Sequence, residues 1–498
     1  MTTQARRMTI AEVMRRLRAV ELVDNEAMSG SAGHEESDVT VSGITDDSRN
    51  VAPGDLYCAW AGSAVDSHDF IAGAAEAGAT AALVERPAPG VRIPQIIVHD
   101  GRRAAAIAAS MLYGEPEHSL RLAGVTGTNG KTTTVWVLRH MLSMRDATAS
   151  LGTLGLILED GSTVPDSEAL TTPGPVELAR TLRMLVDRGV RTLAMEVSSH
   201  ALDQGRVHAL QFDVAVFTNL TRDHLDYHGT LEEYRQAKRS LVSLLKPDGS
   251  AIVNADEPAW HGLTREAAAS LTYGTEHPAD VRATDIELTA SGARFELHTP
   301  DGSTQTVLPL LGDFNVHNVL AAAGACLAMG FTVHETATAM ATIPQVPGRL
   351  ERISDVPCPV LRDYAHTPDA LKQVLTALRP LAAGRLIAVF GAGGDRDRGK
   401  RQLMGAVATE HADVAIVTSD NPRTEDPDAI IDDIEKGMSG GHVRITDRRE
   451  AIAHALEIAE ADDVILLAGK GHETYQIIGE EKRSFDERQI VSSLVGAA

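Results

Sequence analysis

Residues 127–133 (GTNGKTT) have the composition of a loop that binds phosphate groups. They follow an apolar segment, 120–125, that predicts a strand, and they precede a segment that predicts a helix. Glycines let backbone N–H groups face phosphate oxygens, and a helix N-terminus adds partial positive charge. Lys131 can reach the outer phosphates, and the hydroxyl of Thr132 can bind Mg²⁺. Val125 stands where the Walker pattern has a glycine, so the sequence predicts a variant phosphate loop; a glycine turn with an exposed lysine is the alternative.

A carboxylate, two histidines and a lysine follow in the same part of the chain. Glu196 ends an apolar segment, and the loop NLTRDHLDYHG carries His224 and His228. Lys238 lies ten residues after His228. Mg²⁺ usually prefers oxygen ligands, so a histidine ligand would be unusual. Taken alone, the carboxylate is also compatible with a helix cap, the histidines with packing, and the lysine with a solvated helix.

Two polar segments stand out near the C-terminus. Residues 395–401 carry four basic and two acidic side chains, a local excess of positive charge in an acidic chain. Residues 420–423 (DNPR) combine turn-forming residues with Arg423, whose guanidinium can bind a carboxylate through two hydrogen bonds. A plain loop turn is the alternative interpretation of this second segment.

The order of predicted strands and helices along the chain indicates an α/β fold class with three domains. Residues 1–114 predict a small N-terminal α/β domain, and residues 115–345 a central P-loop ATPase-like α/β domain. In residues 346–498, strands and helices alternate regularly, which predicts a C-terminal Rossmann-like α/β domain with a parallel sheet covered on both faces. Ligands then bind beyond the carboxyl ends of the strands.

Composition limits the function further. The 498 residues carry a formal charge of −23, which argues against general binding of nucleic acid. Three widely spaced cysteines form neither a disulfide framework nor a zinc motif. The N-terminus lacks the apolar region of a signal peptide, and no apolar stretch reaches the ~20 residues of a membrane span. We therefore expect a cytoplasmic protein, and a monomer because nothing points to a partner surface.

Eleven motifs in order resemble the Mur ligase family of ATP-dependent amide-forming enzymes, and they span nearly the whole chain. They are GTNGKTT, TTPG, EVSSHAL, TNLTRDHLDYHG, YRQAK, GDFNVHN, PGRLE, DYAHTPDAL, GGDRDRGKR, SDNPR and GKGHETYQ. The resemblance implies that the three domains bind UDP, ATP and an amino acid, in that order.

The resemblance also implies a reaction. ATP converts a substrate carboxylate into an acyl phosphate with the help of Mg²⁺, and an amine then displaces the phosphate. The substrates implied are ATP, UDP-MurNAc-L-Ala-D-Glu and meso-diaminopimelate, so the product serves peptidoglycan synthesis and with it cell shape and division. Transfer between two anions requires alignment and neutralisation of charge.

Site residues carry over by position in the motifs. Lys131 would steady the γ-phosphate, Thr132 and Glu196 would hold one Mg²⁺, and His224 and Lys238 would serve a second metal ion. In the family, the lysine matching Lys238 carries a carbamate formed with CO₂, which turns an ammonium into an oxygen ligand. The residues that resemble ATP contacts are Gly127, Thr128, Asn129, Gly130, Lys131, Thr132, Thr133, Asn318, Arg349 and Asp363. The residues that resemble contacts to the nucleotide-sugar peptide are Ser48, Thr171, Thr172, Ser198, Gln204 and Arg206.

The resemblance places the amino-acid site in the third domain. Its residues are Arg396, Asp420, Asn421, Pro422, Arg423, Gly469 and Glu473. In the family the DNPR motif accompanies enzymes that use meso-diaminopimelate, whose second carboxylate Arg423 can bind. L-lysine or L-ornithine remains the alternative substrate. More remote alternatives are a ligase of the folate polyglutamate type and a P-loop ATPase that moves a partner.

Overall fold

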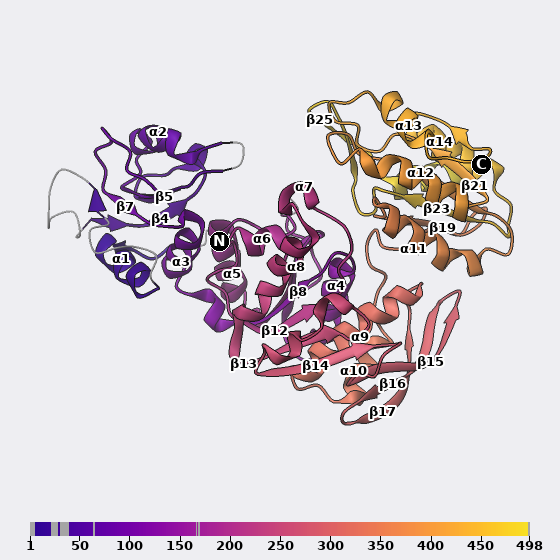
Figure 1. Ribbon diagram of the computed structural model, residues 1–498, viewed down its shortest axis with the longest axis horizontal. Coiled ribbons are helices and arrows are strands. Elements are labelled where there is room, and N and C mark those ends of the chain that lie inside the picture. Colours follow the sequence, from indigo (N-terminus) through magenta and orange to yellow (C-terminus); the bar gives the residue numbers. More distant parts are fainter. Residues whose placement is uncertain are drawn as a thin grey trace. The chain divides into compact units, whose positions relative to one another are not determined.

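The computed structural model describes residues 5–20, 28–29, 39–62, 65–165, 167 and 170–496 (Figure 1). The chain forms two compact units. Unit 1 comprises Met1–Thr272 with Gly324–Met329, and unit 2 comprises Tyr273–Ala323 with Gly330–Ala498. The domain boundaries predicted from the sequence stay predictions.

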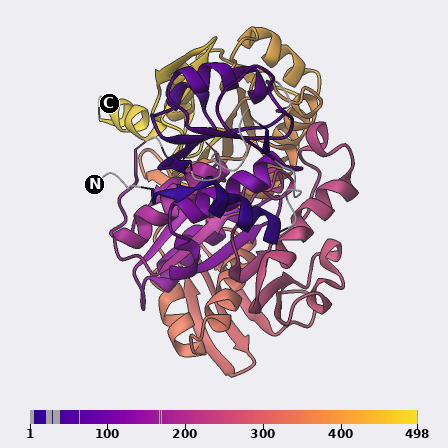
Figure 2. The same cartoon turned by 90° about the vertical axis from the view of Figure 1, so that its left-hand side faces the viewer.

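The N-terminal part of unit 1 is a sheet between helices, drawn in indigo and purple nearest the viewer in Figure 2. The strand order is β2 (Met28–Ser29), β7 (Gln95–Ile97), β6 (Ala81–Val84), β5 (Asp55–Ala59) and β4 (Gly43–Thr45), all parallel except β2. Helices α1 (Ile10–Ala19) and α3 (Gly101–Leu112) pack on one face, and α2 (Ile71–Glu76) packs on the other. Short elements complete this part: β1 (Met8–Thr9) paired with β3 (Thr40–Val41), and the 3₁₀ turns η2 (Ser48–Asn50) and η3 (Ser67–Phe70).

The central part of unit 1 carries the phosphate loop on a largely parallel sheet. The strand order is β10 (Gly155–Ile157), β9 (Thr148–Gly152), β11 (Thr192–Glu196), β8 (Arg121–Thr126), β12 (Phe212–Phe217) and β13 (Leu245–Asn254). Its helices are α4 (Lys131–Leu142), α5 (Pro175–Asp187), α6 (Ser199–Asp203), α7 (Leu225–His228) and α8 (Leu231–Arg239). Its 3₁₀ turns are η4 (Pro116–Ser119), η5 (Ser240–Leu244), η6 (Pro258–Trp260) and η7 (Leu263–Arg265), and β14 (Ala269–Gly274) follows them. Strands β9, β11, β8 and β12 run parallel, so their carboxyl ends meet at one edge.

Unit 2 begins with the last three strands of a ten-stranded sheet and ends in an α/β sandwich. Strands β15 (Val281–Thr289), β16 (Gly292–Thr299) and β17 (Gly302–Leu308) pair antiparallel, as the alternating sequence predicts. Helices α9 (Asp313–Ala328), whose end from Gly324 belongs to unit 1, and α10 (Val333–Met340) follow.

The sandwich has the strand order β18 (Glu351–Ser354), β19 (Val360–Asp363), β23 (Val464–Ala468), β20 (Leu386–Phe390), β21 (Val414–Val417) and β22 (Val443–Arg444). All its strands are parallel except β18. One face packs against α11 (Pro368–Leu378), α12 (Gly399–His411) and α13 (Pro427–Glu435), and the other against α14 (Arg448–Ile458) and α15 (Glu487–Val495). The 3₁₀ turn η8 (Arg379–Leu381) and the hairpin β24 (Tyr475–Ile478) with β25 (Glu481–Ser484) complete the unit.

Candidate active site

The phosphate loop follows β8 and leads into α4, as the sequence predicts. Gly127 has φ +146°, and a Cβ atom there would overlap with Oγ1 of Thr218, so only glycine fits. The backbone N–H groups of Thr128 and Asn129 donate to the main-chain and side-chain oxygens of Asn219, each at 2.8 Å. The Thr218 hydroxyl donates to the Asn129 carbonyl at 2.7 Å. The loop is therefore fixed against the carboxyl end of β12.

Two lysines point at the same carbonyl oxygen of this loop. Lys131 Nζ donates to the carbonyls of Gly127 (3.0 Å) and Thr128 (2.9 Å), and Lys238 Nζ donates to Gly127 at 2.7 Å. Lys238 is 1 % exposed, and its Nζ lies 4.4 Å from the centre of the Tyr234 ring. Burial, and next the charge of Lys131, hold the pKa of Lys238 well below its usual value. The structure therefore brings the two predicted lysines together and favours a neutral amine at Lys238.

Glu196 ends β11, directly beside the strand that carries the phosphate loop. It pairs in register with Val125 of β8 and is 1 % exposed. Its carboxylate accepts hydrogen bonds from the Thr153 N–H (2.8 Å) and the Thr153 hydroxyl (3.2 Å). This buried carboxylate therefore lies at the sheet edge where the phosphates of a bound nucleotide would lie.

His224 belongs to a cluster of three imidazoles. Its ring centre lies 4.8 Å from that of His200, and the His200 and His228 centres are 5.4 Å apart. Burial lowers the pKa of all three, and that of His200 falls to about 4. Tyr227 and Tyr234 complete the cluster, with ring centres 4.8 and 5.2 Å from His228. The three imidazoles are therefore neutral near pH 7.

Sequence reasoning missed His200 and Tyr234 in this cluster. His200 lies within the quoted EVSSHAL motif, and that position was the available signal. Among the residues that the structure describes, no group of three or more His, Cys, Asp or Glu side chains is arranged to hold a metal ion. The predicted metal ligands are not such a group, because they also include the hydroxyl of Thr132 and a modified Lys238.

The residues predicted to contact the nucleotide-sugar peptide form one hydrogen-bonded group. The Thr172 hydroxyl donates to the main-chain oxygen of Glu196 (2.9 Å) and accepts from the Ser198 N–H (3.1 Å). Arg206 donates to the Thr172 carbonyl (2.9 Å) and, through Nε and Nη2, to Gln204 Oε1 (3.0 and 2.6 Å). The hydroxyls of Thr171 and Thr153 are 3.3 Å apart, and Thr153 is the residue that binds Glu196. The group is thus continuous with the carboxylate beside the phosphate loop.

Ser48 lies in η2 of the N-terminal part, after Asp47, whose carboxylate accepts from the N–H of Arg49 at 3.0 Å. A Cβ on Gly174, in the TTPG motif, would lie 3.4 Å from the Asp46 carboxylate, so this turn approaches the loop that carries Thr171 and Thr172. Ser48 is therefore in the same unit as the other predicted nucleotide-sugar contacts and close to that loop.

The other predicted ATP residues are in unit 2. Asp363 ends β19, and its carboxylate accepts from the N–H groups of Leu350 (2.7 Å) and Ala365 (2.8 Å). Burial raises its pKa despite the nearby charge of Arg349. The Arg349 guanidinium lies 4.7 Å from the centre of the Tyr364 ring. Asn318 lies in α9, and its amide donates to Asn315 at 2.9 Å.

The predicted amino-acid residues gather at the carboxyl edge of the sandwich sheet of unit 2, which contains β21 and β23. Asp420 and Asn421 follow β21, whereas Gly469 follows β23. The Asn421 amide donates to Glu473 Oε2 at 2.9 Å. Arg423 has φ +52°, and its Nη1 donates to the Gly394 carbonyl at 2.7 Å. This edge therefore presents a guanidinium, an amide and carboxylates together.

Arg396 and Pro422 border the same group. A Cβ on Gly393 would lie 3.0 Å from Arg423 Nη1 and 3.8 Å from Arg396 Cγ, so the two arginines flank this glycine. Arg396 is exposed, whereas Pro422 is buried. The structure thus places both predicted carboxylate-binding arginines side by side.

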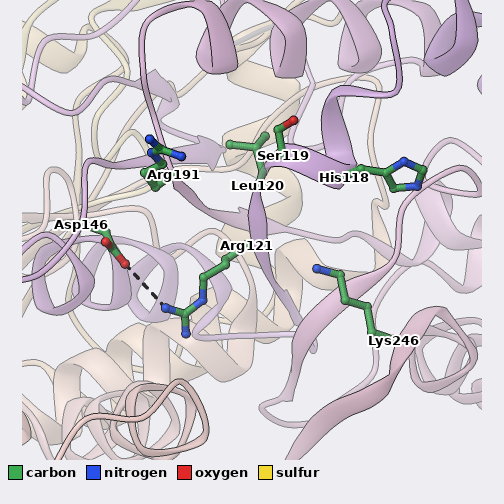
Figure 3. A pocket seen from close by; sticks show the side chains of 7 residues that line it. All are labelled: His118, Ser119, Leu120, Arg121, Asp146, Arg191 and Lys246. Carbon is green, nitrogen blue, oxygen red and sulfur yellow. Dashed lines mark ion pairs between the residues drawn. The ribbon is translucent and has the colours of Figure 1, made fainter.

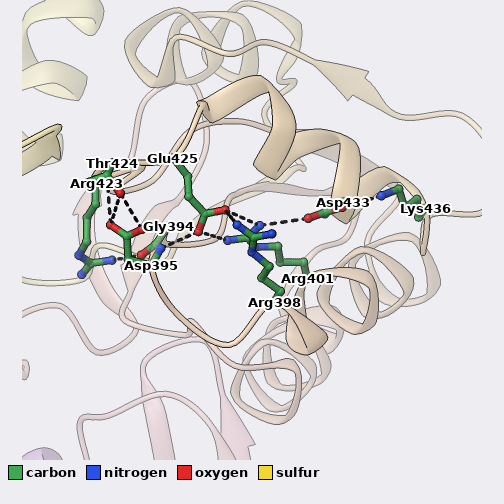
Figure 4. A network of polar contacts seen from close by, with 9 residues as sticks. All are labelled: Gly394, Asp395, Arg398, Arg401, Arg423, Thr424, Glu425, Asp433 and Lys436. Carbon is green, nitrogen blue, oxygen red and sulfur yellow. Dashed lines mark hydrogen bonds and ion pairs between the residues drawn. The ribbon is translucent and has the colours of Figure 1, made fainter. Parts of the chain in front are cut away.

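The excess of positive charge in residues 395–401 is largely neutralised (Figure 4). Glu425 accepts from Arg398 (2.9 Å) and from Arg401 (2.8 and 3.1 Å), and Arg401 also donates to Asp433 (3.0 Å). These arginines, Arg401 first, lower the pKa of Glu425 to about 2. Of the four cationic side chains in the segment, Arg398 and Arg401 therefore stabilise the loop through ion pairs.

A cavity of about 500 Å³ lies at the opposite edge of the central sheet of unit 1 (Figure 3). Its lining includes Arg121 and Lys246, at the amino ends of β8 and β13, and Arg191, which precedes β11. Arg121 pairs with Asp146 at 3.5 Å. The cavity contains none of the predicted site residues.

Comparison with known families decides the identity. Three family models match: "Mur ligase family, catalytic domain" at residues 40–113, "Mur ligase middle domain" at 125–326, and "Mur ligase, glutamate ligase domain" at 348–471. The UDP-N-acetylmuramoyl-L-alanyl-D-glutamate–2,6-diaminopimelate ligase of Geobacillus kaustophilus is 48 % identical over 90 % of this chain and 94 % of its own length. The chain belongs to the Mur ligase family. The ligases of the same name from Gloeobacter violaceus and Xylella fastidiosa are each 44 % identical, over 95 % and 92 % of this Mur ligase.

Solved structures agree with this assignment. A UDP-N-acetylmuramoyl-L-alanyl-D-glutamate–2,6-diaminopimelate ligase is 34 % identical, with a TM-score of 0.70 over 99 % of both chains. A folylpolyglutamate synthase of Mycobacterium tuberculosis shares only the fold, at 20 % identity and a TM-score of 0.62 over 74 % of this chain. The predicted three-domain α/β fold of this Mur ligase is confirmed. Within the described ranges, no helix is long and apolar enough to span a membrane.

Proposed function

We propose that this Mur ligase joins meso-diaminopimelate to UDP-MurNAc-L-Ala-D-Glu with ATP, through an acyl phosphate. One observation carries the proposal: the hydrogen-bonded group around Thr172 is continuous with Glu196, beside the phosphate loop. An acceptor bound to that group would lie next to the γ-phosphate. The names of the relatives, at 44–48 % identity, support the same reaction.

The donor chemistry of the site fits Mg²⁺. Glu196 offers a buried carboxylate and Thr132 a buried hydroxyl at the start of α4. We infer that these two residues hold one ion, and that His224 and a carbamylated Lys238 serve a second. When bound, Mg²⁺ neutralises charge on the phosphates during transfer.

Lys238 is suited to become a carbamate. A neutral amine attacks CO₂, an N–C bond forms and one proton leaves, so that the side chain ends in an anionic carboxylate. Its burial and the adjacent Lys131 favour the neutral amine that this step requires. The product would also place an anionic carboxylate beside the positive charge of Lys131.

Different residues of the chain would bind and orient the two substrates, ATP and the nucleotide-sugar peptide. Lys131 and the N–H groups of the loop neutralise and orient the phosphates, while Thr172, Ser198 and Arg206 orient the nucleotide-sugar peptide. Its terminal carboxylate attacks the γ-phosphate, ADP leaves, and the amine of the amino acid displaces phosphate from the acyl group. We propose that Asn318, Arg349 and Asp363 complete the ATP site.

Arg423 is the residue that we expect to select diaminopimelate. Its guanidinium can bind the distal carboxylate, which lysine and ornithine lack, through two hydrogen bonds. Glu473 would receive the accompanying ammonium, and Arg396 would bind a carboxylate. A site built for a polar group rejects an analogue that lacks it by a factor of up to ~10⁴. We further propose that the enzyme acts in the cytoplasm as a monomer.

Phosphate release by the purified protein tests this function. The assay contains ATP, Mg²⁺ and UDP-MurNAc-L-Ala-D-Glu, with meso-diaminopimelate, L-lysine or L-ornithine as the amine. Release with meso-diaminopimelate alone is the expected result. Release with lysine or ornithine would keep the ligase and discard the role of Arg423. If no phosphate were released with any of the three amines, but phosphate were released with a folate and glutamate, a ligase of the folate polyglutamate type would replace the proposed function.

A further inference from the structure

Lys470 is a buried cation for which the proposed mechanism has no use. Its side chain is fully buried and follows the carboxyl end of β23. The two neighbouring positions have no room for a side chain, because a Cβ on Gly469 would overlap with the Asp420 carboxylate and one on Gly471 would lie 2.7 Å from Tyr364 Cβ. A charged side chain is rarely retained in such a place without partners, since its burial is costly.

The partners of Lys470 are two of the predicted amino-acid residues. Its Nζ donates to Asn421 Oδ1 at 3.0 Å and to Glu473 Oε2 at 3.2 Å. The Asn421 amide donates to the same Glu473 oxygen at 2.9 Å, which closes a ring of three hydrogen bonds. The Ile477 N–H donates to Asn421 Oδ1 at 3.0 Å, so two donors fix which way this amide faces. The ring therefore holds Asn421 and Oε2 of Glu473 in one arrangement.

The charges around Lys470 are matched to a substrate ammonium. Asp420 and Glu473 carry two negative charges against the one positive charge of Lys470, and the other buried cation nearby, Arg448, is paired with Glu487 at 2.8 Å. Asp420 Oδ2 is buried and has no hydrogen-bond partner among the described residues. One ammonium would supply that partner. Although burial acts to raise it, the pKa of Asp420 is held below its usual value by Lys470 and then Arg448, so this carboxylate is ionised.

We propose that Lys470 is a positioning residue of the amino-acid site, which fixes Asn421 and Glu473 so that these residues and Asp420 receive an ammonium group of diaminopimelate. The proposal rests on the proposed function. Lys470 itself does not touch the substrate. Its removal would leave these carboxylates without their cation, and it would free the Asn421 amide to turn.

The test compares Lys470→Met with the wild-type enzyme. Met keeps the length of the side chain and removes its charge. We expect the KM for meso-diaminopimelate to rise about 10- to 100-fold, because hydrogen bonds to charged groups are lost. The KM values for ATP and for UDP-MurNAc-L-Ala-D-Glu should stay within about twofold. The kcat/KM ratio of diaminopimelate over 2-aminopimelate, which lacks one ammonium, should fall by a similar factor.

Asp463→Asn is the matched control. Asp463 is also buried, pairs with Arg385 at 2.7 Å and lies at the other end of β23. This variant should lose stability without changing the ratio between the two amino acids. A second variant, Lys470→Ala, is assayed with propylammonium and with 1-propanol, and only the cation should restore the KM.

The outcomes separate the two proposals. An unchanged amino-acid ratio in Lys470→Met, or equal rescue of Lys470→Ala by 1-propanol, would overturn the positioning role and leave the ligase intact. A wild-type enzyme that releases no phosphate with diaminopimelate would instead overturn the proposed function. If Lys470→Ala does not fold, the ratio measured on Lys470→Met still decides.

Discussion

Lys238 in unit 1 and Lys470 in unit 2 are both buried lysines, yet their surroundings are opposite. Lys238 is 1 % exposed and donates to a carbonyl that also accepts from a second lysine, Lys131. Lys470 is 0 % exposed and contacts an amide and a carboxylate. The first amine lies beside a second lysine, whose charge acts on it more strongly than that of Asp223, whereas the second contacts a carboxylate directly.

The difference shows that the countercharge, not burial, decides what a buried lysine can do. Where no carboxylate contacts the amine, desolvation favours its neutral, nucleophilic form, which suits carbamylation of Lys238. Where a carboxylate contacts the amine, as at Lys470, the side chain supports Asn421 and Glu473 through hydrogen bonds.

The largest effect is expected from Lys238→Arg. Arginine keeps a positive charge but cannot form the carbamate, so its guanidinium would repel the metal ion that the carbamate serves. We expect phosphate release to fall by roughly 10³-fold or more, in line with the loss of other groups that act at the reacting centre. The assay is the one proposed for the function, with wild type as the reference. An active Lys238→Arg enzyme would remove the carbamate from the mechanism.

Methionine substitutions should change stability in opposite directions at the two sites. Lys470→Met leaves buried carboxylates without their cation and should cost about 3–5 kcal/mol. Lys238→Met removes an amine that burial disfavours, so it should raise the melting temperature of the CO₂-free protein, by about 2–4 °C for each kcal/mol gained. Thermal unfolding in CO₂-depleted buffer measures both.

The pH dependence of the Lys238→Met difference follows from linkage. The folded pKa of Lys238 lies below the unfolded value of 10.5, so between these values the unfolded chain binds a proton that the folded protein does not. Wild-type stability therefore falls as pH drops from 10.5, and the advantage of Lys238→Met should shrink from pH 7 to pH 9.5. A constant difference between the two proteins would contradict a neutral Lys238.

Arg423→Ala should have a smaller and more selective effect. We expect the KM for meso-diaminopimelate to rise by roughly 10- to 100-fold, because a charge-assisted pair with the distal carboxylate is lost. The preference over L-lysine should shrink with it, while the KM for ATP stays unchanged. Arg398→Ala is the control, since that guanidinium is bound to Glu425 instead. Equal loss in both variants would mean that the loop, not the guanidinium, selects the amino acid.

The sequence predicted well those parts of the site that local patterns encode. Residues 127–133 combine glycines, a lysine and threonines that set a strand, a loop and a helix in one short segment, and the structure has all three. Glu196 could be placed because a polar residue at the end of an apolar strand lies at the edge where ligands bind.

Long-range charge pairing was beyond such patterns. Residues 395–401 have a positive excess, but Glu425, which binds two of their arginines, lies 24 residues beyond Arg401. Lys470 stood inside a quoted motif, yet its partner Asn421 lies 49 residues earlier. Whether a lysine is buried, and which charged group lies beside it, depends on the order of the strands in the sheet. The residues next to the lysine in the sequence do not determine that order.

The smallest effect is expected at the start of the helix that carries Lys238. Thr230 caps α8 and exchanges hydrogen bonds with Glu233 (3.0 and 3.1 Å), while Thr332 caps α10 of unit 2 in the same way with Glu335 (2.9 and 3.3 Å). Either threonine changed to alanine should cost about 1 kcal/mol of stability. Only Thr230→Ala should also raise the CO₂ concentration needed for half-maximal activity, because a frayed first turn loosens the helix that buries Lys238. Titration of activity with bicarbonate at constant pH measures this. If Thr332→Ala shifted the titration equally, the shift would come from lost stability in general, and the reactive lysine would owe its environment to the loop carbonyl of Gly127 rather than to its helix.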